Sequence, residues 1–359
     1  MKRVTIINDL HIGVQRVSGT TIQSAIDLRA WAQRNYATLL RAAGNNTTVI
    51  VNGDLADSYE IPLAEALQLY IETGKYLDLN LDSDVVYVLG NHDLSKDDSK
   101  LGGIAFIGHL LKVAYPTRFQ LVSKPSSLRD GIHIIPHVVN QEAFDAALAA
   151  VPGGTKFLFL HCNYDSSFAS QADHSLNLPR ATAKELKERG ITMILGHEHQ
   201  GRTLMGGSVV IVGNQFPTSI SDCLAHGSAQ KDGVKKFAQI VDVDGGVELL
   251  PYWDSDGADG YAEIDWQDLT DAPAQAKFIK VVGKATAEQA SEVIRKISIF
   301  RQSSPAFVVS NGVEIEQLDD LGDLTLTVDS IKAINVLDLL WELLEPKQVE
   351  ALKKLVAAG

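Results

Sequence analysis

Short apolar runs alternate with longer segments of helical periodicity along roughly the first 250 residues of the chain. The apolar runs are rich in β-branched residues and are typical of buried strands. They comprise residues 4–7, 47–52, 84–89, 156–160, 191–195 and 208–212. Helical spacing marks residues 24–43, 62–77 and 141–150, the last preceded by Asn140 as an N-cap. Strands that alternate with helices predict an α/β core in which helices cover the faces of sheets.

The pattern changes beyond residue 250. Between Asp244 and Ala274 the chain has nine acids and no Lys or Arg, which indicates a solvated connection. A strand–helix–strand unit follows, in which Thr286 and Gln289 have capping-box spacing. The last 30 residues have the pattern of two amphipathic helices split near Pro346. We therefore predict a core domain at 1–250, an acidic linker at 251–275, a small α/β capping domain at 276–328 and a helical segment at 329–359.

The composition narrows the class of protein. With 359 residues, 45% of them hydrophobic, the chain can bury a sizeable core, and no apolar run is long enough to cross a membrane. Its first residues lack the apolar region of a signal peptide, so we expect a cytoplasmic protein. Cys162 and Cys223 lack metal-site or disulfide spacing and are expected to be reduced thiols. The net charge of −13 argues against a generally basic surface, although divalent cations or a basic partner could supply positive charge to a nucleic-acid enzyme.

Polar residues come directly after five of the predicted strands. In open α/β sheets ligands bind at the carboxyl ends of the strands, so we expect these side chains to converge. Carboxylates, an amide and imidazoles suit Mn²⁺, Fe²⁺ or Zn²⁺ better than Ca²⁺. Two such ions ~3.5–4 Å apart can clamp a phosphate and activate a water for in-line attack. In chain order, the residues are Asp9, His11, Asp54, Asp57, Asn91, His92, Asp93, His161, His197 and His199.

The ordered blocks DLH, GD, GNHD, H and GHEH resemble the signature of the calcineurin-like metallophosphoesterases, over roughly residues 1–212. The resemblance implies an α/β fold with a β-sandwich core flanked by helices, here followed by a small α+β capping domain and C-terminal helices. It also implies two divalent metal ions, with Mn²⁺ preferred over Fe²⁺, Mg²⁺ and Zn²⁺. One ion would take Asp9, His11, Asp54 and His199. The other would take Asp54, Asn91, His161 and His197, so that Asp54 bridges the two.

The same resemblance gives two further residues catalytic roles. His92 would not bind metal but would stabilise the transition state at the scissile phosphate and protonate the leaving oxygen. Asp93 would hold the ring of His92, as carboxylates commonly do beside a working imidazole. Gly53, Gly90 and Gly196 are expected to let the chain turn sharply where the strands end.

Other polar residues near these blocks have competing interpretations. Asp57 is either an outer-sphere partner of an ion or a loop-capping residue. Glu198 lies between two expected ligands and is predicted to face away from them, in solvent or behind the site. Arg202 is interpreted as a surface residue in preference to a phosphate contact. Cys162 and the remaining histidines are interpreted as structural; these are His109, His133, His137, His174 and His226.

Three functions remain open from the sequence. The first is a DNA exonuclease or endonuclease of the SbcD type, which acts in DNA repair, recombination or replication. The second is a small-molecule or protein phosphoesterase, such as a cyclic-nucleotide phosphodiesterase or a phosphatase. The third is a non-catalytic binding subunit, which is disfavoured because every catalytic position, including His92, is filled.

The nuclease is favoured by a second layer of resemblance. The opening block NDLHIG and the segment 209–246 resemble the SbcD branch, and residues 277–310 stand where that branch has its DNA-capping domain. The terminal helices stand where it attaches to an ABC-type coiled-coil ATPase of the SbcC kind. We therefore expect DNA as substrate, that ATPase as partner, and a homodimer. The net acidity and the balanced charges of the capping region weigh against DNA binding by this chain alone.

Overall fold

The computed structural model describes residues 3–14, 21–95, 100–128, 131–166, 175–224, 236–242, 246–251, 260–271 and 276–316. It divides into two compact units, which we treat separately. One comprises residues 1–283 together with 291–314, and the other comprises residues 284–290 together with 315–359. The predicted C-terminal helices at 329–359 lie outside the described residues.

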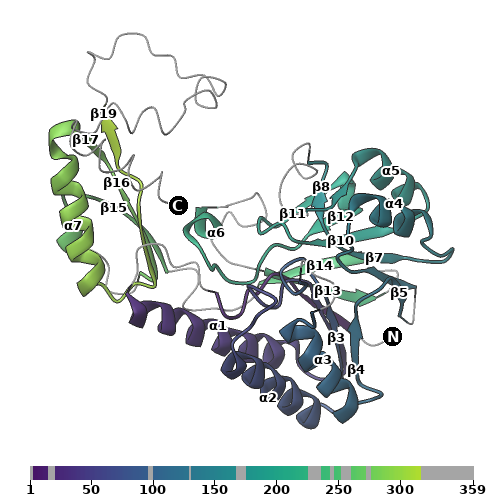
Figure 1. Ribbon diagram of the computed structural model, residues 1–359. Helices are drawn as coiled ribbons and strands as arrows, with labels where there is room; N and C mark the ends of the chain where they lie inside the picture. The colour runs from purple at the N-terminus through teal and green to yellow at the C-terminus, as the bar shows by residue number, and fades with distance from the viewer. Residues whose placement is uncertain are drawn as a thin grey trace, which may run out of the picture. The chain divides into compact units, whose positions relative to one another are not determined.

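The first large sheet is built around the early strands of the chain. Its order is β14 (Gly246–Pro251), β13 (Lys236–Asp242), β1 (Arg3–Ile7), β2 (Thr47–Asn52), β3 (Asp84–Val88) and β4 (Phe119–Val122). Strands β1 to β4 run parallel to one another, whereas β13 is antiparallel to both β1 and β14. Three helices cover the outer face of this sheet (Figure 1): α1 (Ile22–Ala43), α2 (Leu63–Leu79) and α3 (Gly103–Ala114).

The second large sheet carries the later strands. Its order is β11 (Arg202–Leu204), β12 (Val209–Ile211), β10 (Thr192–Gly196), β7 (Phe157–His161), β6 (Ile132–Ile135) and β5 (Ser126–Ser127). The four central strands are parallel and the two edge strands are antiparallel to their neighbours. Helices α4 (Gln141–Ala149) and α5 (Arg180–Glu188) pack on its outer face (Figure 1). Shorter elements complete this region: β8 (Asn163–Tyr164), β9 (Asn177–Leu178), the 3₁₀ turn η1 (Met205–Gly207) and α6 (Ile220–Leu224).

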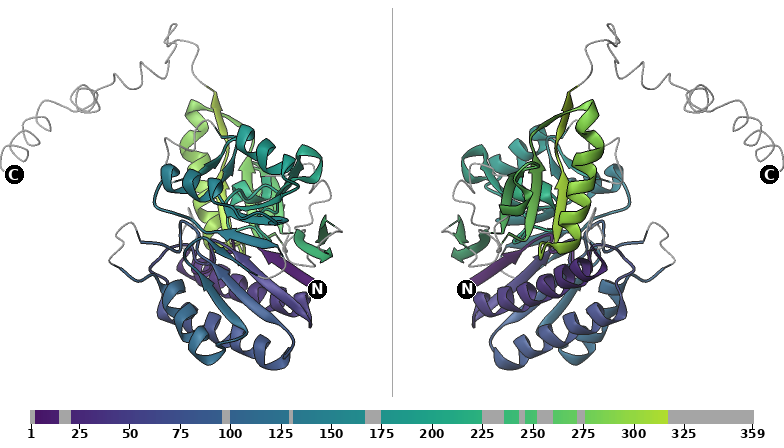
Figure 2. Two further views of the ribbon diagram at one scale, coloured as in Figure 1. Left: turned by 90° about the vertical axis from the view of Figure 1, so that its right-hand side faces the viewer. Right: turned by 90° about the vertical axis from the view of Figure 1, so that its left-hand side faces the viewer.

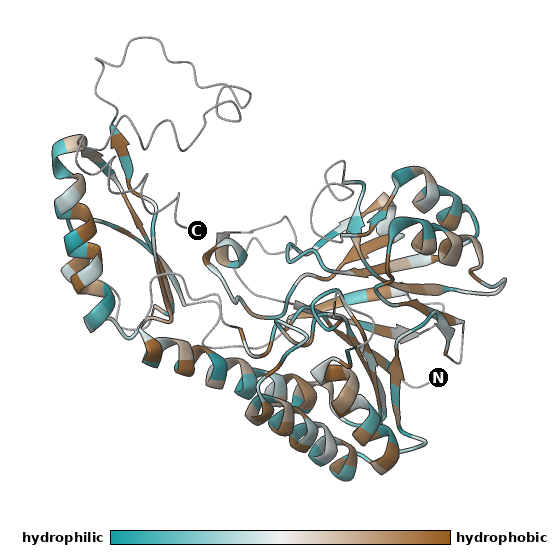
Figure 3. Ribbon diagram, viewed as in Figure 1, coloured by the Kyte–Doolittle hydropathy of each residue, from teal (hydrophilic) through white to brown (hydrophobic). Residues whose placement is uncertain are grey.

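The two sheets pack face to face, and this arrangement explains the apolar strand pattern. Val4 and Ile6 point between the sheets and meet Phe159 and Ile194 there. Neighbouring residues such as Ile7 point outward into the layer beneath the helices. Strands buried on both faces require nearly continuous apolar runs, which appear as apolar colouring along both sheets (Figure 3). The predicted mixed α/β architecture and its principal strands are confirmed.

A small parallel sheet follows the core, in the order β15 (Tyr261–Asp265), β16 (Phe278–Val282), β18 (Val308–Asn311). Helix α7 (Ala290–Ser303) lies alongside it (Figure 2). Strand β15 lies inside the segment 251–275 that the sequence predicted to be a linker. Its acids face outward while Ile264 and the following Trp266 are buried, so the segment has an apolar face despite its charge. Remaining short elements are η3 (Leu269–Asp271), β17 (Lys284–Thr286), η4 (Ala287–Gln289) and β19 (Glu314–Glu316).

Local signals predicted from the sequence are present. Asn140 caps α4 by accepting a hydrogen bond from the amide of Ala143 at 2.9 Å. Thr286 and Gln289 form the expected capping box. Among the described helices, none combines the length and the apolarity that crossing a bilayer requires.

Candidate metal centre

The carboxyl ends of the two large sheets are joined by side-chain amides at the point where the predicted ligands begin. The Asn8 amide nitrogen donates to the carbonyl of Leu195 at 3.0 Å, and the Asn52 amide nitrogen donates to the carbonyl of Leu160 at 3.0 Å. Both asparagines are fully buried. Because Leu160 directly precedes His161, these bonds hold ligand-bearing strand ends of the second sheet against the first.

The loops after β1 and β2 hold several of these residues in a strained backbone. They pair with each other, since the amide of Asp9 donates to the carbonyl of Gly53 at 3.3 Å and the amide of His11 to that of Asp54 at 3.0 Å. The φ angles are 51° at Asp9, 48° at His11, 46° at Asp54 and 85° at His197. Left-handed backbone at non-glycine residues costs on the order of 1–3 kcal/mol each and persists where the surroundings impose it.

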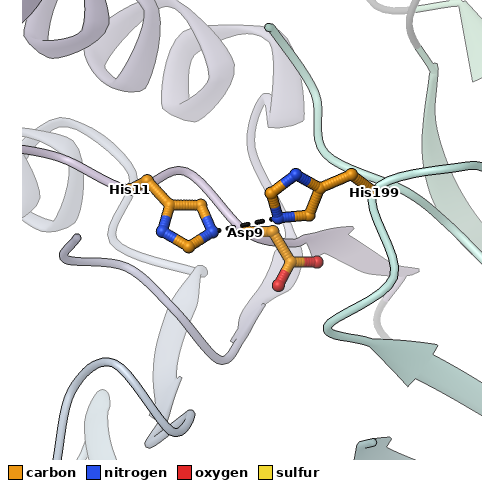
Figure 4. A group of neighbouring side chains, drawn as sticks. All are labelled: Asp9, His11 and His199. Atoms are coloured by element: carbon orange, nitrogen blue, oxygen red, sulfur yellow. Dashed lines mark hydrogen bonds between the residues drawn. The ribbon is translucent and has the colours of Figure 1, made fainter. Parts of the chain in front are cut away.

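One cluster of donor atoms combines the first loop with the end of the second sheet. Asp9, His11 and His199 offer ligand atoms that all lie within 4.8 Å of one another (Figure 4). The Nε2 atoms of His11 and His199 are 3.0 Å apart. Two neighbouring ligands of one ion with bonds of ~2.1 Å at right angles are also ~3.0 Å apart, so the pair fits a shared cation. We call these three residues the Asp9 cluster.

A second cluster combines the loop after β3 with β7 and β10. The Asn91 Oδ1 atom lies 3.0 Å from His161 Nε2 and 3.0 Å from His197 Nδ1. Asp54, His161 and His197 also offer three ligand atoms within 4.8 Å of one another. We call Asn91, His161 and His197 the Asn91 cluster. Its oxygen and nitrogen donors suit the same class of ion as the first.

Asp54 lies between the two clusters. Its Oδ2 atom is 3.3 Å from His161 Nε2 and 3.9 Å from His11 Nε2. Its Oδ1 atom accepts a hydrogen bond from the backbone amide of His92 at 2.9 Å. One carboxylate therefore faces imidazoles of both clusters, as the bridging role expected from the sequence requires.

Each imidazole that turns Nε2 toward the donor clusters has an oxygen beside its Nδ1 atom. Asp57 Oδ1 lies 3.4 Å from Nδ1 of His11, and Asp222 Oδ1 lies 2.7 Å from Nδ1 of His199. The corresponding partner of His161 is the carbonyl of Asn52, at 3.1 Å. An acceptor at Nδ1 favours the tautomer that keeps the Nε2 lone pair free for a metal. Of the two interpretations of Asp57, the contact with His11 supports the outer-sphere one.

The electrostatics of the clusters favour cations. Burial raises the pKa of Asp54, but the positive charge of His161 and other histidines outweighs it and holds the pKa well below its ordinary value. Burial lowers the pKa of His11, yet the Asp57 carboxylate 3.4 Å from its Nδ1 atom and the other nearby carboxylates raise the pKa to about 9. For His161, burial is likewise outweighed, chiefly by Asp54, and its pKa rises to about 9. The negative charge of these carboxylates favours the protonated imidazoles, and the same negative charge attracts metal cations.

His197 and Asp9 are shifted in ways that also depend on burial. Burial and the charge of His161 lower the pKa of His197 to about 3, so its ring is neutral and able to bind a metal at ordinary pH. Burial raises the pKa of Asp9. Both Asp9 carboxylate oxygens accept from the backbone amide of His197, at 3.0 and 3.1 Å, which ties the Asp9 cluster to the Asn91 cluster.

The sequence matches the family described as calcineurin-like phosphoesterase over residues 2–201, more than half of the 359-residue chain. The chain belongs to the calcineurin-like phosphoesterase family. Membership of this family and the two donor clusters support a metal-dependent phosphoester hydrolase. The family uses divalent ions, and the Asp9 and Asn91 clusters are the candidate positions for them.

Solved structures give a weaker likeness. One is a Staphylococcus aureus protein assigned as a 5′-nucleotidase, determined with α-ketoglutarate; the alignment covers 70% of this chain and 54% of that chain, at 14% identity and a TM-score of 0.36. Another is the cold-active protein-tyrosine phosphatase of a psychrophilic Shewanella, with 70% and 80% coverage, 11% identity and a TM-score of 0.32. The phosphoesterase thus spans about half the length of the first structure. No curated protein matches it significantly.

The two predicted catalytic residues have different surroundings. His92 Nδ1 lies 2.7 Å from the backbone carbonyl of Asp57, and its ring meets that of His11 edge-on at 4.8 Å between centroids. Asp93, expected to hold the His92 ring, instead accepts from the backbone amides of Ala56 at 3.0 Å and Gly90 at 2.9 Å. The carbonyl of Asp57 therefore takes the orienting role, because the Asp93 carboxylate is turned into the two loops it ties together. Burial and the charge of Asp54 raise the pKa of Asp93 to about 7.

Two of the glycines are required by close approach. Gly53 has a φ of 92°, and a Cβ there would lie 2.0 Å from Nδ1 of His161. At Gly90, a Cβ would lie 2.2 Å from Oδ1 of Asp54. Gly90 has no positive φ, so the expected turning role belongs to Gly53, whereas Gly90 keeps space for the carboxylate between the clusters.

The other polar residues considered in the sequence analysis are not members of the two donor clusters. Glu198 accepts from the backbone amide of Tyr164 at 2.6 Å and pairs with Arg202, so both lie at the edge of the site with their charges engaged. Cys162 is fully buried, and burial raises the pKa of its thiol, which fits the structural interpretation. The histidines that were interpreted as structural have different surroundings. His133 forms a hydrogen bond with Ser127 at 2.9 Å, and His109 is exposed on α3. His174 and His226 lie outside the described residues.

Two further residues lie near the site. His137 was interpreted as structural, and its charge helps to lower the pKa of His197, which places it near the Asn91 cluster. Asp222 was not singled out. The spacing of Ser219 and Asp222 could have indicated a helix cap, but the contact with His199 spans 23 positions and has no local signal.

Proposed function

We propose that this calcineurin-like phosphoesterase is an SbcD-type DNA nuclease that hydrolyses phosphodiester bonds with two divalent ions, preferably Mn²⁺. The observation that carries the hydrolytic part is the single carboxylate of Asp54 between two clusters of nitrogen and oxygen donors. The DNA part is supported by the NDLHIG block and by the small α/β sheet that follows the core, where such nucleases have a DNA-capping domain.

The proposed mechanism assigns a role to each group of residues. Asp9, His11 and His199 would hold one ion, Asn91, His161 and His197 the other, and Asp54 both. When bound, the ions would polarise the phosphate and lower the pKa of the attacking water. His92, oriented through Nδ1 by the carbonyl of Asp57, would stabilise the developing charge and donate a proton to the leaving 3′-oxygen, which leaves a 5′-phosphate.

We further propose a homodimer and an ABC-type coiled-coil ATPase as partner, acting in the cytoplasm. Support for a dimer comes from exposed apolar side chains on α2 and α3, which are Leu63, Leu67, Phe106, Leu110 and Val113. Surfaces of this kind commonly mark protein interfaces. Support for a DNA-gripping partner comes from the net charge of −13, because an acidic chain gains little from phosphate contacts of its own.

The decisive experiment is Mn²⁺-dependent cleavage of linear single- and double-stranded DNA by the purified chain, beside a generic bis-aryl phosphodiester. His92→Ala serves as the inactive control, and His109→Ala, an exposed residue of α3, as the matched active control. DNA cleavage that His92→Ala abolishes would support the nuclease. Turnover of the diester with intact DNA, unchanged by addition of the ATPase partner, would favour the small-molecule phosphoesterase. Failure on both substrates, again with the partner present, would favour the non-catalytic binding subunit.

A further inference from the structure

We infer that Asp222 is a positioning residue that fixes the ring of His199 for metal binding. This rests on the proposed function, because it assigns to a residue beyond the family match at 2–201 a task in holding one of the two ions. The contact that suggests it is short: Asp222 Oδ1 lies 2.7 Å from Nδ1 of His199.

The carboxylate of Asp222 is itself immobilised. It is 4% exposed, and its Oδ2 atom accepts from the backbone amide of Thr218 at 2.8 Å, the hydroxyl of Thr218 at 3.0 Å and the backbone amide of Ser219 at 3.0 Å. Three donors on Oδ2 satisfy that oxygen and leave Oδ1 directed to His199. The carboxylate is therefore held in one orientation, with Oδ1 placed to accept from the ring of His199.

The segment that carries Asp222 is anchored to the core on its N-terminal side. Gln215 Oε1 accepts from the backbone amide of Asn8 at 2.6 Å, at the end of β1. The next residue, Phe216, is fully buried with its ring 5.2 Å from that of Trp31 between centroids. His199, in contrast, is 29% exposed and borders an open pocket. The carboxylate is therefore the fixed partner and the imidazole the one that would otherwise rotate.

The consequence concerns the proton on His199. When the Asp222 Oδ1 atom accepts in this contact, Nδ1 of His199 carries the hydrogen and Nε2 carries the lone pair. That Nε2 atom is the one 3.0 Å from Nε2 of His11 in the Asp9 cluster. Outer partners of this kind typically change metal affinity by about 10–100-fold when they are removed.

Asp222 also closes a helix cap, and the test must separate the two roles. Ser219 Oγ accepts from the amide of Asp222 at 3.3 Å, so Ser219→Ala weakens the cap without touching His199. Asp222→Asn is isosteric and can still accept from Thr218 and Ser219 through its oxygen. Its amide nitrogen then faces Nδ1 of His199 as a donor, which forces the hydrogen onto Nε2 and removes the metal lone pair.

The experiment compares wild type, Asp222→Asn and Ser219→Ala by calorimetric titration with Mn²⁺ and by the visible absorption of bound Co²⁺. We expect two ions in wild type, and in Asp222→Asn one ion unchanged and the other weakened at least tenfold. Ser219→Ala should bind both as wild type does, with a lower Tm in the metal-free state. Unchanged affinities for both ions in folded Asp222→Asn would overturn the inference.

A second measurement needs no folded variant at position 222. Long-range ¹H–¹⁵N spectra of histidine-labelled, metal-free wild type report which ring nitrogen of His199 is protonated, with the signal assigned by its loss in His199→Gln. A hydrogen on Nδ1 supports the positioning role, and a neutral ring with the hydrogen on Nε2 would overturn it. Should wild type bind no ion at all, the two-ion function fails, while this tautomer still tests the contact with Asp222.

Discussion

The Asp9 cluster and the Asn91 cluster offer similar donor atoms but are supported differently. In the Asp9 cluster, both imidazoles have a carboxylate behind them, Asp57 for His11 and Asp222 for His199. In the Asn91 cluster, His161 has only a backbone carbonyl behind it. The side chain of His199 is 29% exposed, whereas that of His161 is fully buried.

One site can therefore hold two ions of the same kind with different strength. Carboxylates behind the imidazoles make them more basic ligands, but exposure gives chelators and water access to the same cluster. In the Asn91 cluster Asn91 and His197 are half-buried, but the His161 ring is fully buried, so we expect an ion held by that ring to exchange more slowly. We therefore expect the Asp9 cluster to release its ion first.

Asp54→Ala should abolish metal binding at both clusters and with it the difference between them. Because one carboxylate faces both clusters, its loss should remove both ions and reduce phosphodiester hydrolysis to background. Elemental analysis of protein purified in Mn²⁺ measures the ion content, with Asp27→Ala on the exposed face of α1 as control. Two ions retained by Asp54→Ala would refute the bridging assignment.

His92→Ala should leave both clusters intact and stop turnover. The His92 ring packs edge-on against His11, but the hydrogen bond that His92 gives to Asp54 comes from its backbone amide, which Ala retains. We expect unchanged Mn²⁺ stoichiometry and a loss of kcat of roughly 10²–10⁴-fold, the usual contribution of a positioned acid or base. If the variant instead loses an ion, His92 belongs to the ligands.

The metal-free protein should lose stability between pH 6.5 and about 9. The folded-state pKa values of His11 and His161 are both about 9, above the ordinary 6.5, so each imidazolium stabilises the fold below pH 6.5 and this contribution disappears as the pH rises through 9. Mn²⁺ requires neutral imidazoles, so its stabilising effect should grow over the same range.

Thermal unfolding from pH 6 to 9.5, with EDTA and with Mn²⁺, measures both effects. His11→Gln in the Asp9 cluster and His161→Gln in the Asn91 cluster should each make the metal-free Tm depend less on pH. A metal-free Tm that stays constant across this range in wild type would contradict the pKa values of both histidines.

Asn8→Ala and Asn52→Ala should give the smallest effects. Each removes a buried hydrogen bond that joins the sheets, at a cost of ~0.5–1.5 kcal/mol in the free energy of unfolding. Asn52→Ala acts beside His161 and Asn8→Ala acts on the strand end before His197, so both should also weaken the ion of the Asn91 cluster. Urea unfolding with EDTA, with the exposed Asn45→Ala as control, measures the stability. Losses equal to that of the control would show that the bonds do not join the sheets.

The sequence was most informative where function follows from position along a strand. Apolar runs buried on both faces predicted β1, β2, β3, β7 and β10, and the rule that ligands gather at strand ends brought their polar neighbours together. It failed where the relevant partner is distant in the chain or is a backbone atom. Asp222 reaches His199 only through the fold, and the carbonyl of Asp57 replaces the Asp93 carboxylate that the family resemblance implied.

Composition misled in one place for a related reason. The acidic stretch after residue 250 predicted a linker, but β15 needs only a few apolar side chains such as Ile264 to pair with β16. Net charge along a segment does not reveal which face of a strand carries it. The sequence also could not distinguish the two clusters, because they differ in the group beside the Nδ1 atom of each imidazole, which is a carboxylate in one cluster and a backbone carbonyl in the other.

The left-handed backbone at Asp9, His11, Asp54 and His197 has a consequence for protein engineering. Transplanting this metal centre onto another scaffold by copying side-chain identities alone would fail, because ordinary strands and helices do not present residues at these angles. A designer would have to copy the paired loops, including Gly53, as one block. The backbone conformation of these loops therefore specifies the metal centre as much as the identities of its side chains do.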